Sequence, residues 1–218
     1  MRREREAKVA ELARRGLLRS QRLRRAMLTV RRENFIPAPY RDHAYEEIPL
    51  PLPGERATIS CPHSYPLFYE ALDLHDGHRF LEVGVGSGYG TALAREVVGP
   101  RGIVVAIDID QTTLAFARKN LERARYAVIL VHGDGGMGYA EHAPYDRICV
   151  TAACPAVPQP LIEQLASRGR LIAPVLDRRR QRLTLLERTA EGIRSTIIAD
   201  VLYVSLQGRY GVGSDPRQ

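Results

Sequence analysis

The chain has 218 residues, of which 44% are hydrophobic and 26% are charged, a composition typical of a soluble globular protein and not of a disordered or fibrous one. No apolar run approaches the roughly 20 residues of a membrane-spanning helix, so we expect no membrane association. The chain begins with charged residues, and its three cysteines (Cys61, Cys149 and Cys154) show no CxxC spacing. We therefore expect a cytoplasmic protein with reduced thiols.

The net charge of +7 is concentrated near the N-terminus. Residues 1–32 contain twelve Arg or Lys and three Asp or Glu, which gives +9, so the remaining 186 residues sum to −2. Apolar residues from Val9 to Val30 recur at three- and four-residue spacing, with a break at Gly16. We expect one or two amphipathic helices over residues 4–32 with a solvated basic face; the alternative is an arm that binds RNA.

Residues 34–66 contain seven prolines, which exclude a continuous helix or a central strand. Aromatic and aliphatic residues are interleaved with them, among them Tyr40, Tyr45 and Ile59. A long irregular segment with such residues indicates an ordered, functional loop that lies across the rest of the domain.

Beyond residue 66, short apolar runs alternate with amphipathic segments. We expect strands over residues 79–83, 102–107, 127–132, 146–151 and 170–174, and helices over 67–74, 91–98, 111–123 and 159–165. This alternation predicts an α/β fold with a Rossmann-like, doubly wound and mostly parallel sheet. Two further strands, 182–187 and 193–206, joined near Gly192, predict an antiparallel edge.

The most specific motif is a glycine-rich turn after the strand 79–83, with the sequence Leu-Glu-Val-Gly-Val-Gly-Ser-Gly over residues 81–88. Its glycines stand at relative positions 1, 3 and 5, whereas dinucleotide-binding turns have positions 1, 3 and 6. An acidic residue before the first glycine is typical of methyltransferases, in which the turn holds the methionine part of S-adenosylmethionine. The cofactor contacts predicted in this turn are Glu82, Gly84, Gly86 and Ser87.

Carboxylates also follow the next two strands. Asp108 ends the second strand, where a carboxylate accepts hydrogen bonds from ribose hydroxyls, while Asp110 is better placed to cap the following helix. Asp134 and Gly135 follow the third strand, where the carboxylate is suited to the exocyclic amine of adenine. Three consecutive strands that end in Glu82, Asp108 and Asp134 predict a single adenosine-type cofactor.

Several stretches resemble the protein-L-isoaspartate O-methyltransferase family, and together they span nearly the whole chain after the N-terminal helices. They are Arg32–Pro37, Tyr45–Leu50, Ala57-Thr58-Ile59-Ser60-Cys61-Pro62-His63, Gly133-Asp134-Gly135, Ala143-Pro144-Tyr145-Asp146 and Val150–Pro155. The sequence departs from the family at Cys61, where alanine or glutamine is usual, and at Ser205, where proline is usual.

The resemblance implies a methyltransferase that uses S-adenosylmethionine to esterify the free carboxylate of L-isoaspartyl residues in damaged proteins and peptides. The ester then closes to a succinimide, which reopens partly to normal aspartate. By position, Ser60 matches the family's active-site serine, and Ala57, Thr58 and Ile59 match cofactor contacts beside it. His63 either touches the substrate carboxylate or packs beneath the loop, and we place it among the substrate-binding residues.

This interpretation divides the chain into helices and a substrate-side loop (1–66), a cofactor-binding region (67–210) and a disordered tail (211–218), within one compact, monomeric domain.

A peptide-tailoring aspartate methyltransferase would have the same fold and stays an alternative. An RNA methyltransferase is less favoured, because the polar-Pro-Pro-aromatic motif of base methylation is missing after residue 150. We therefore expect no nucleic-acid partner. No metal is expected either, because the cysteines and His63 lack a ligand spacing.

Overall fold

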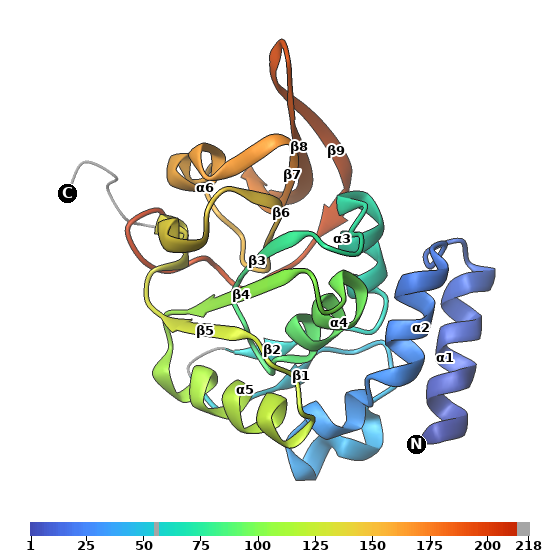
Figure 1. The fold of residues 1–218 in the computed structure, drawn as a ribbon. Coiled ribbons are helices and arrows are strands. Elements are labelled where there is room, and N and C mark those ends of the chain that lie inside the picture. Colours follow the sequence, from blue (N-terminus) through green and yellow to red (C-terminus); the bar gives the residue numbers. More distant parts are fainter. Residues whose placement is uncertain (55–56, 213–218) are drawn as a thin grey trace.

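The computed structural model describes residues 1–54 and 57–212 (Figure 1). A twisted sheet crosses the middle of the molecule, and the two N-terminal helices stack beside it at one side of the view. The tail expected over residues 211–218 lies outside the described residues from position 213 onward.

The central sheet has seven strands. They are β3 (Arg79–Val83), β4 (Ile103–Asp108), β5 (Ile129–His132), β6 (Tyr145–Val150), β7 (Leu165–Asp177), β8 (Arg180–Thr189) and β9 (Gly192–Val201), in the spatial order β5-β4-β3-β6-β7-β8-β9. The first five are mutually parallel, and β8 and β9 pair in antiparallel fashion. The mostly parallel sheet with an antiparallel edge is therefore confirmed. Strands β3, β4 and β6 are buried along nearly their whole length, as parallel strands covered on both faces require.

Four helices follow or precede these strands: α3 (Ser64–Leu72), α4 (Tyr89–Val98), α5 (Gln111–Arg123) and α6 (Gln159–Glu163). One sheet face contributes Phe80, Val104 and Ile172 to a core shared with α3 and α4. The opposite face contributes Leu81 to a second core that includes Leu161 of α6. Helix α5 begins as predicted, because the Asp110 side chain accepts a hydrogen bond from the Thr113 amide at 2.6 Å.

The N-terminal segment forms α1 (Arg2–Arg14) and α2 (Gln21–Thr29), separated near Gly16 as the sequence predicts. Leu12 and Leu23 belong to the same core as α3 and α4, so these helices are integral to the domain. Nine of the twelve cationic side chains in residues 1–32 are exposed and form the expected solvated face. Arg5 and Arg32 are buried, which the charge pattern does not reveal.

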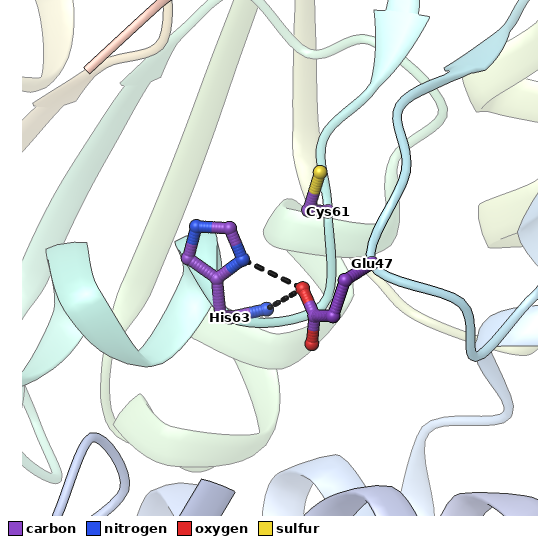
Figure 2. A group of neighbouring side chains, drawn as sticks. All are labelled: Glu47, Cys61 and His63. Carbon is purple, nitrogen blue, oxygen red and sulfur yellow. Dashed lines mark hydrogen bonds and ion pairs between the residues drawn. The ribbon is translucent and has the colours of Figure 1, made fainter. Parts of the chain in front are cut away.

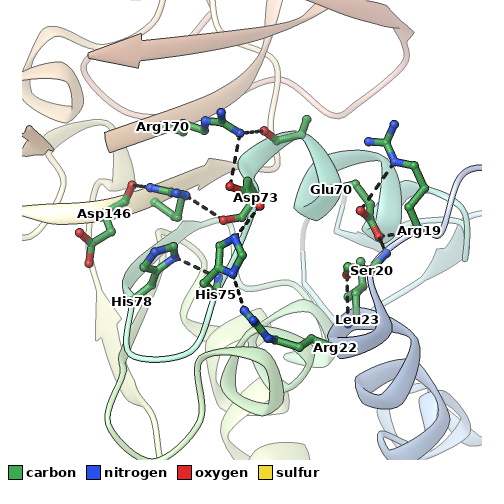
Figure 3. Close-up of polar contacts among 12 residues, drawn as sticks. Arg19, Ser20, Arg22, Leu23, Glu70, Asp73, His75, His78, Asp146 and Arg170 are labelled. Carbon is green, nitrogen blue, oxygen red and sulfur yellow. Dashed lines mark hydrogen bonds and ion pairs between the residues drawn. The ribbon is translucent and has the colours of Figure 1, made fainter. Parts of the chain in front are cut away.

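Polar contacts fasten α2 to the end of α3 (Figure 3). The Glu70 carboxylate accepts hydrogen bonds from the backbone amides of Arg19 and Ser20, at 2.9 and 2.8 Å, just before α2 begins. A carboxylate at this end of a helix also complements the helix dipole. A cavity of about 190 Å³ lies beside this junction, between Leu23 and Val97. It lies at the amino-terminal edge of the sheet, opposite the glycine-rich turn.

Where the structure describes it, the proline-rich segment forms short elements: the 3-10 turns η1 (Arg32–Phe35) and η2 (Ala38–His43), and the strands β1 (Leu50–Pro51) and β2 (Thr58–Ile59). β1 and β2 pair in antiparallel fashion, with Leu50 opposite Ile59. Two further 3-10 turns, η3 (Gly135–Met137) and η4 (Ala140–His142), follow β5.

Two strands differ from the prediction. β7 begins at Leu165, five residues early, because Arg168 adopts a left-handed conformation at a bulge that lets the strand continue. β9 ends at Val201 instead of residue 206, because the chain then leaves the edge of the sheet. Residues 204–206 lie beside Ala153, whose amide donates to Val204 and whose carbonyl accepts from Leu206.

Candidate functional site

The glycine-rich turn lies at the carboxyl end of β3, where the strand order reverses between β4 and β6. Ligands of open α/β sheets bind at such points. Gly84 has φ +90°, and a Cβ there would lie 2.4 Å from Oγ1 of Thr151. That hydroxyl donates to the carbonyls of Val83 and Gly84, at 3.0 and 2.8 Å. Glycine is therefore required at this position, both for the turn and for the close approach of the chain after β6.

Glu82 lies behind the turn, in the core. Its carboxylate accepts a hydrogen bond from the Thr91 hydroxyl at 2.5 Å and a longer one from the Tyr69 hydroxyl at 3.4 Å. Burial raises the pKa of Glu82 to about 7, although these two hydrogen bonds oppose the rise. A Cβ on Gly90 would lie 2.4 Å from Oε1 of Glu82. Glu82 thus touches the backbone that leads from the turn into α4.

Asp108 ends β4 next to the turn. Its two carboxylate oxygens accept hydrogen bonds from the Gly86 amide at 3.2 Å and the Asp110 amide at 3.0 Å. Burial raises the pKa of Asp108 despite these bonds. A backbone hydrogen bond from Val85 also lowers the pKa, so three amides bind a carboxylate that can accept about four hydrogen bonds, and acceptor capacity is left for a ligand hydroxyl.

Asp134 and Gly135 follow β5 and complete the row of strand ends. A Cβ on Gly135 would lie 2.4 Å from Cγ1 of Val83, so the backbone here closes against the end of β3. The Asp134 carboxylate accepts from the amides of Gly136 and Arg209, at 2.9 and 2.7 Å. The C-terminal segment around residue 208 therefore covers this carboxylate, which the sequence did not predict.

The segment 57–59 runs past the other side of the turn. A Cβ on Gly86 would lie 3.7 Å from the carbonyl oxygen of Thr58, so β2 passes close to the turn and leaves room for only a small residue there. The Ala57 carbonyl accepts from the Leu52 amide at 3.0 Å, and Ile59 is buried. The structure thus brings the predicted residues 57–59 to the glycine turn, although 25 or more residues separate them in sequence.

Ser60 is held in place by a buried arginine. Arg32 is 1% exposed and donates hydrogen bonds to the carbonyls of Ser60 and Ala44, both at 2.7 Å. Its guanidinium lies over the rings of Tyr65 and Tyr89, 5.6 and 5.2 Å from their centroids. A planar guanidinium can bind two carbonyls and stack on aromatic rings at the same time, which a lysine ammonium group cannot do as well.

A second hydroxyl lies beside Ser60. The phenol of Tyr203 interacts with the side chains of Ser64 and Ser60, and burial raises the pKa of Tyr203. Tyr203 follows β9, and its ring packs against Phe68 of α3 at 5.3 Å between centroids. The serine hydroxyl therefore has a neutral, hydrogen-bonding neighbour and no basic partner close enough to deprotonate it among the contacts that the described residues make.

His63 is tied to the loop before β1 (Figure 2). Its Nδ1 lies 2.6 Å from Oε2 of Glu47, and its amide donates to the same oxygen at 3.4 Å. The other oxygen of Glu47 lies 3.3 Å from the ammonium group of Lys8. Burial alone would raise the pKa of Glu47, but the hydrogen bonds from His63 and Lys8 lower it to about 2.

The site residues that sequence reasoning did not single out are Arg32, Tyr203 and Thr151. Arg32 lies in a stretch that resembles the family, but it is one of twelve basic residues in the first 32, and the sequence does not distinguish it from the exposed ones. Tyr203 and Thr151 reach the site only through the order of strands, which the local sequence does not encode. The assembled site has a glycine cradle and carboxylates on one side, and hydroxyl donors from the loop on the other.

Comparisons with known proteins identify this architecture. The family model of protein-L-isoaspartate(D-aspartate) O-methyltransferases matches residues 3–211. The protein-L-isoaspartate O-methyltransferase of Hyperthermus butylicus is 46% identical over 213 residues, which cover 93% of this chain and 88% of the relative.

Solved structures agree. One protein-L-isoaspartate O-methyltransferase superposes with a TM-score of 0.86 at 33% identity and covers 95% of this chain and 67% of its own. A second structure, from Plasmodium falciparum, is proposed to be such an enzyme and is in complex with S-adenosyl-L-homocysteine. It has a TM-score of 0.82 at 25% identity, and the match covers 92% of this chain and 97% of the other. The chain belongs to the protein-L-isoaspartate(D-aspartate) O-methyltransferase family.

Proposed function

We propose that this chain transfers a methyl group from S-adenosylmethionine to the free carboxylate of L-isoaspartyl residues in damaged proteins and peptides. The observation that carries the proposal is the close approach of β2 to the glycine turn. It supports a role for the Ala57–Ser60 segment between the bound cofactor and the acceptor. Repeated cycles of esterification and succinimide formation would return part of the isoaspartate to aspartate.

The residues present fit the cofactor. The Asp108 carboxylate has acceptor capacity left for a ribose hydroxyl, and Asp134 with Gly135 lies at the adjoining strand end for the adenine. Gly84, Gly86 and Ser87 form the turn that would hold the methionine part, flanked by the residues 57–59. Glu82 would support the turn from behind, because its carboxylate is enclosed by Tyr69, Thr91 and Gly90.

When bound, the cofactor supplies an electrophilic methyl group on a sulfonium. The acceptor carboxylate has an ordinary pKa near 4, so it is already ionised at neutral pH and requires no general base. The role of Ser60 is then to donate a hydrogen bond that orients the carboxylate toward the methyl group. Arg32 fixes the Ser60 backbone, and the exclusion of water with correct alignment provides the rate enhancement.

The alternative acceptors make different products. A tailoring enzyme would methylate normal aspartate, and an RNA methyltransferase would give a base-stable N-methyl product. We assign the exposed basic face of α1 and α2 to the surface of a monomeric, cytoplasmic protein without a nucleic-acid partner. No helix among residues 1–54 and 57–212 is long and apolar enough to cross a membrane.

The test is transfer of labelled methyl from S-adenosylmethionine to an isoaspartyl peptide and to bulk tRNA and rRNA in parallel. We expect label in the peptide that mild base releases as methanol, as a carboxyl methyl ester requires. Base-stable label in RNA, with none in the peptide, would overturn the proposal.

A further inference from the structure

Glu47, Cys61 and His63 bring three metal-binding side chains together (Figure 2). A carboxylate oxygen, the Cys61 sulfur and a His63 ring nitrogen all lie within 4.8 Å of one another. Within residues 1–54 and 57–212 this is the one group of three or more such side chains. The sequence did not reveal it, because Glu47 stands 14 residues before Cys61.

The backbone holds the two contributing segments in register. Glu47 precedes β1, while Cys61 and His63 follow β2, and the pairing of Leu50 with Ile59 ties these strands together. His63 is also the residue at which α3 begins, so its backbone is anchored on the other side. The three donors thus converge because of the fold and do not depend on a flexible tail or loop tip.

The separations are close to those of a tetrahedral site. Zinc bonds of about 2.0–2.3 Å place neighbouring ligand atoms about 3.3–3.6 Å apart. His63 Nδ1 and Glu47 Oε2 are 2.6 Å apart, so an ion that replaces the shared proton need only widen that gap by less than about 1 Å. Since all three donor atoms lie within 4.8 Å of one another, no pair has to close by more than about 1.5 Å, which side-chain rotation supplies.

The donor set selects a class of ion. Thiolate and imidazole ligands are those of zinc and similar thiophilic ions, whereas magnesium and calcium require oxygen ligands. The His63 and Glu47 side chains are 39% and 28% exposed, which gives an ion a path from solvent. Lys8 binds the second oxygen of Glu47 and leaves Oε2 directed at His63.

We propose that Glu47, Cys61 and His63 form a binding site for Zn²⁺ or a similarly thiophilic divalent cation, with three protein ligands and one open position. The site is distinct from the row of carboxylates at the strand ends. Because Cys61 directly follows Ser60, a bound ion would lie near the residue that we assign to the acceptor carboxylate. Binding itself requires neither cofactor nor acceptor, so the proposal stands independently of the assigned reaction.

The test is titration of the full chain with Co²⁺, whose absorption reports both thiolate ligation and tetrahedral geometry, followed by displacement with Zn²⁺. We expect one Co²⁺ per chain, a sulfur-to-cobalt charge-transfer band, and loss of that band on addition of one equivalent of Zn²⁺. Cys61→Ser, Cys61→Ala and His63→Gln should each abolish the band. Each should also weaken Zn²⁺ binding by more than the roughly 10–100-fold expected for loss of an outer-shell partner.

His43→Gln is the matched control, because His43 forms a similar pair with Glu46 at 2.9 Å, is exposed and lacks a nearby thiol. It should leave the band and the stoichiometry unchanged. Thermal unfolding followed by circular dichroism identifies any variant that fails to fold, and the two Cys61 variants provide independent replacements. A band that survives His63→Gln at full strength, or equal loss of binding in His43→Gln, would overturn the proposal.

Discussion

Single side chains at the strand ends have distinct surroundings, and the Asp108 carboxylate is the one that accepts a hydrogen bond from the Gly86 amide of the glycine turn. Replacing Asp108 with alanine should weaken S-adenosylmethionine binding ten- to a hundred-fold, about 1.5–3 kcal/mol for lost bonds to a charged group. Calorimetry measures this affinity directly. The control is Asp177→Ala, since that carboxylate is exposed and ends β7, three strands away from β4 in the sheet. Unchanged affinity in the Asp108 variant would remove this residue from the site.

Replacement of Ser60 should slow methyl transfer to the acceptor without weakening cofactor binding. Ser60→Ala removes one hydrogen bond to a carboxylate, so methyl transfer to an isoaspartyl peptide should slow about ten- to a hundred-fold while cofactor affinity stays nearly constant. Because the acceptor needs no deprotonation, parent and variant should share a flat rate profile between pH 6 and 8. An equal loss of cofactor affinity would instead place Ser60 on the donor side.

Glu82 should make the stability of the fold depend on pH. Burial raises its pKa to about 7, so between pH 4.5 and 7 the folded state keeps a proton that the unfolded state has lost. Stability therefore falls as pH rises through this window, by about 3 kcal/mol in total, and is not affected by Glu82 below it.

The comparison is denaturant unfolding of the parent and Glu82→Gln at pH 5 and pH 8. The parent should lose about 3 kcal/mol more than the variant over this interval, because glutamine has no proton to release. Identical losses in both proteins would show that the Glu82 carboxyl titrates normally.

Among the elements, the link between η1 and the chain after β2 matters most for the acceptor side. Arg32 joins them through its hydrogen bonds to Ser60 and Ala44. Arg32→Lys keeps the charge but loses the planar geometry, so kcat/KM for the peptide should fall at least about tenfold with little change in cofactor affinity. Arg31→Lys is the matched control, because Arg31 is adjacent and exposed, and it should behave like the parent.

Rates are compared well below the melting temperature of each variant, since a buried arginine also supports the fold. A variant with normal kcat/KM and reduced stability would assign Arg32 a purely structural role. A joint loss of cofactor affinity would mean that it also supports the glycine turn through Tyr89.

Helices and strands were predictable where a repeating pattern of apolar residues marks them in the local sequence. The parallel strands β3, β4, β5 and β6 and the helix that Asp110 caps follow from alternating apolar runs and a single side chain, and they lie close to where the sequence predicts them. The proline-rich segment gives no such pattern, because its order comes from contacts such as that of Thr113 with the Pro53 carbonyl at 3.1 Å. The boundary expected at residue 66 falls inside α3, since the same residues close the loop and start the helix.

For the whole molecule, the N-terminal helices are part of the core, as amphipathic helices should be, and they are not the separate arm that their charge left as an alternative. Val9 and Leu12 are buried with residues of α4, and Glu33 accepts a hydrogen bond from Arg5 at 3.2 Å. The basic residues of this segment therefore include both those of a solvated face and two buried arginines. Only the packing distinguishes them, so Arg32 was not identified as a site residue from the sequence.

The candidate site was predictable in its cofactor half and less so in its acceptor half. Strand ends meet at one sheet edge by geometry, which places Asp108 and Asp134 together. Tyr203 and Glu47 approach Ser60 and His63 through loops from distant parts of the chain. Contacts of this kind depend on the assembled fold and leave no local signal in the sequence.

The most direct test of the central claim is methyl transfer to a matched pair of peptides that differ only in an L-isoaspartyl or a normal L-aspartyl residue. The acceptor side described here predicts rapid formation of a base-labile methyl ester on the isoaspartyl peptide and negligible transfer to its aspartyl twin. On longer incubation with excess cofactor, the isoaspartyl peptide should convert in part to the aspartyl one. Comparable methylation of both peptides would contradict the account and favour a tailoring enzyme.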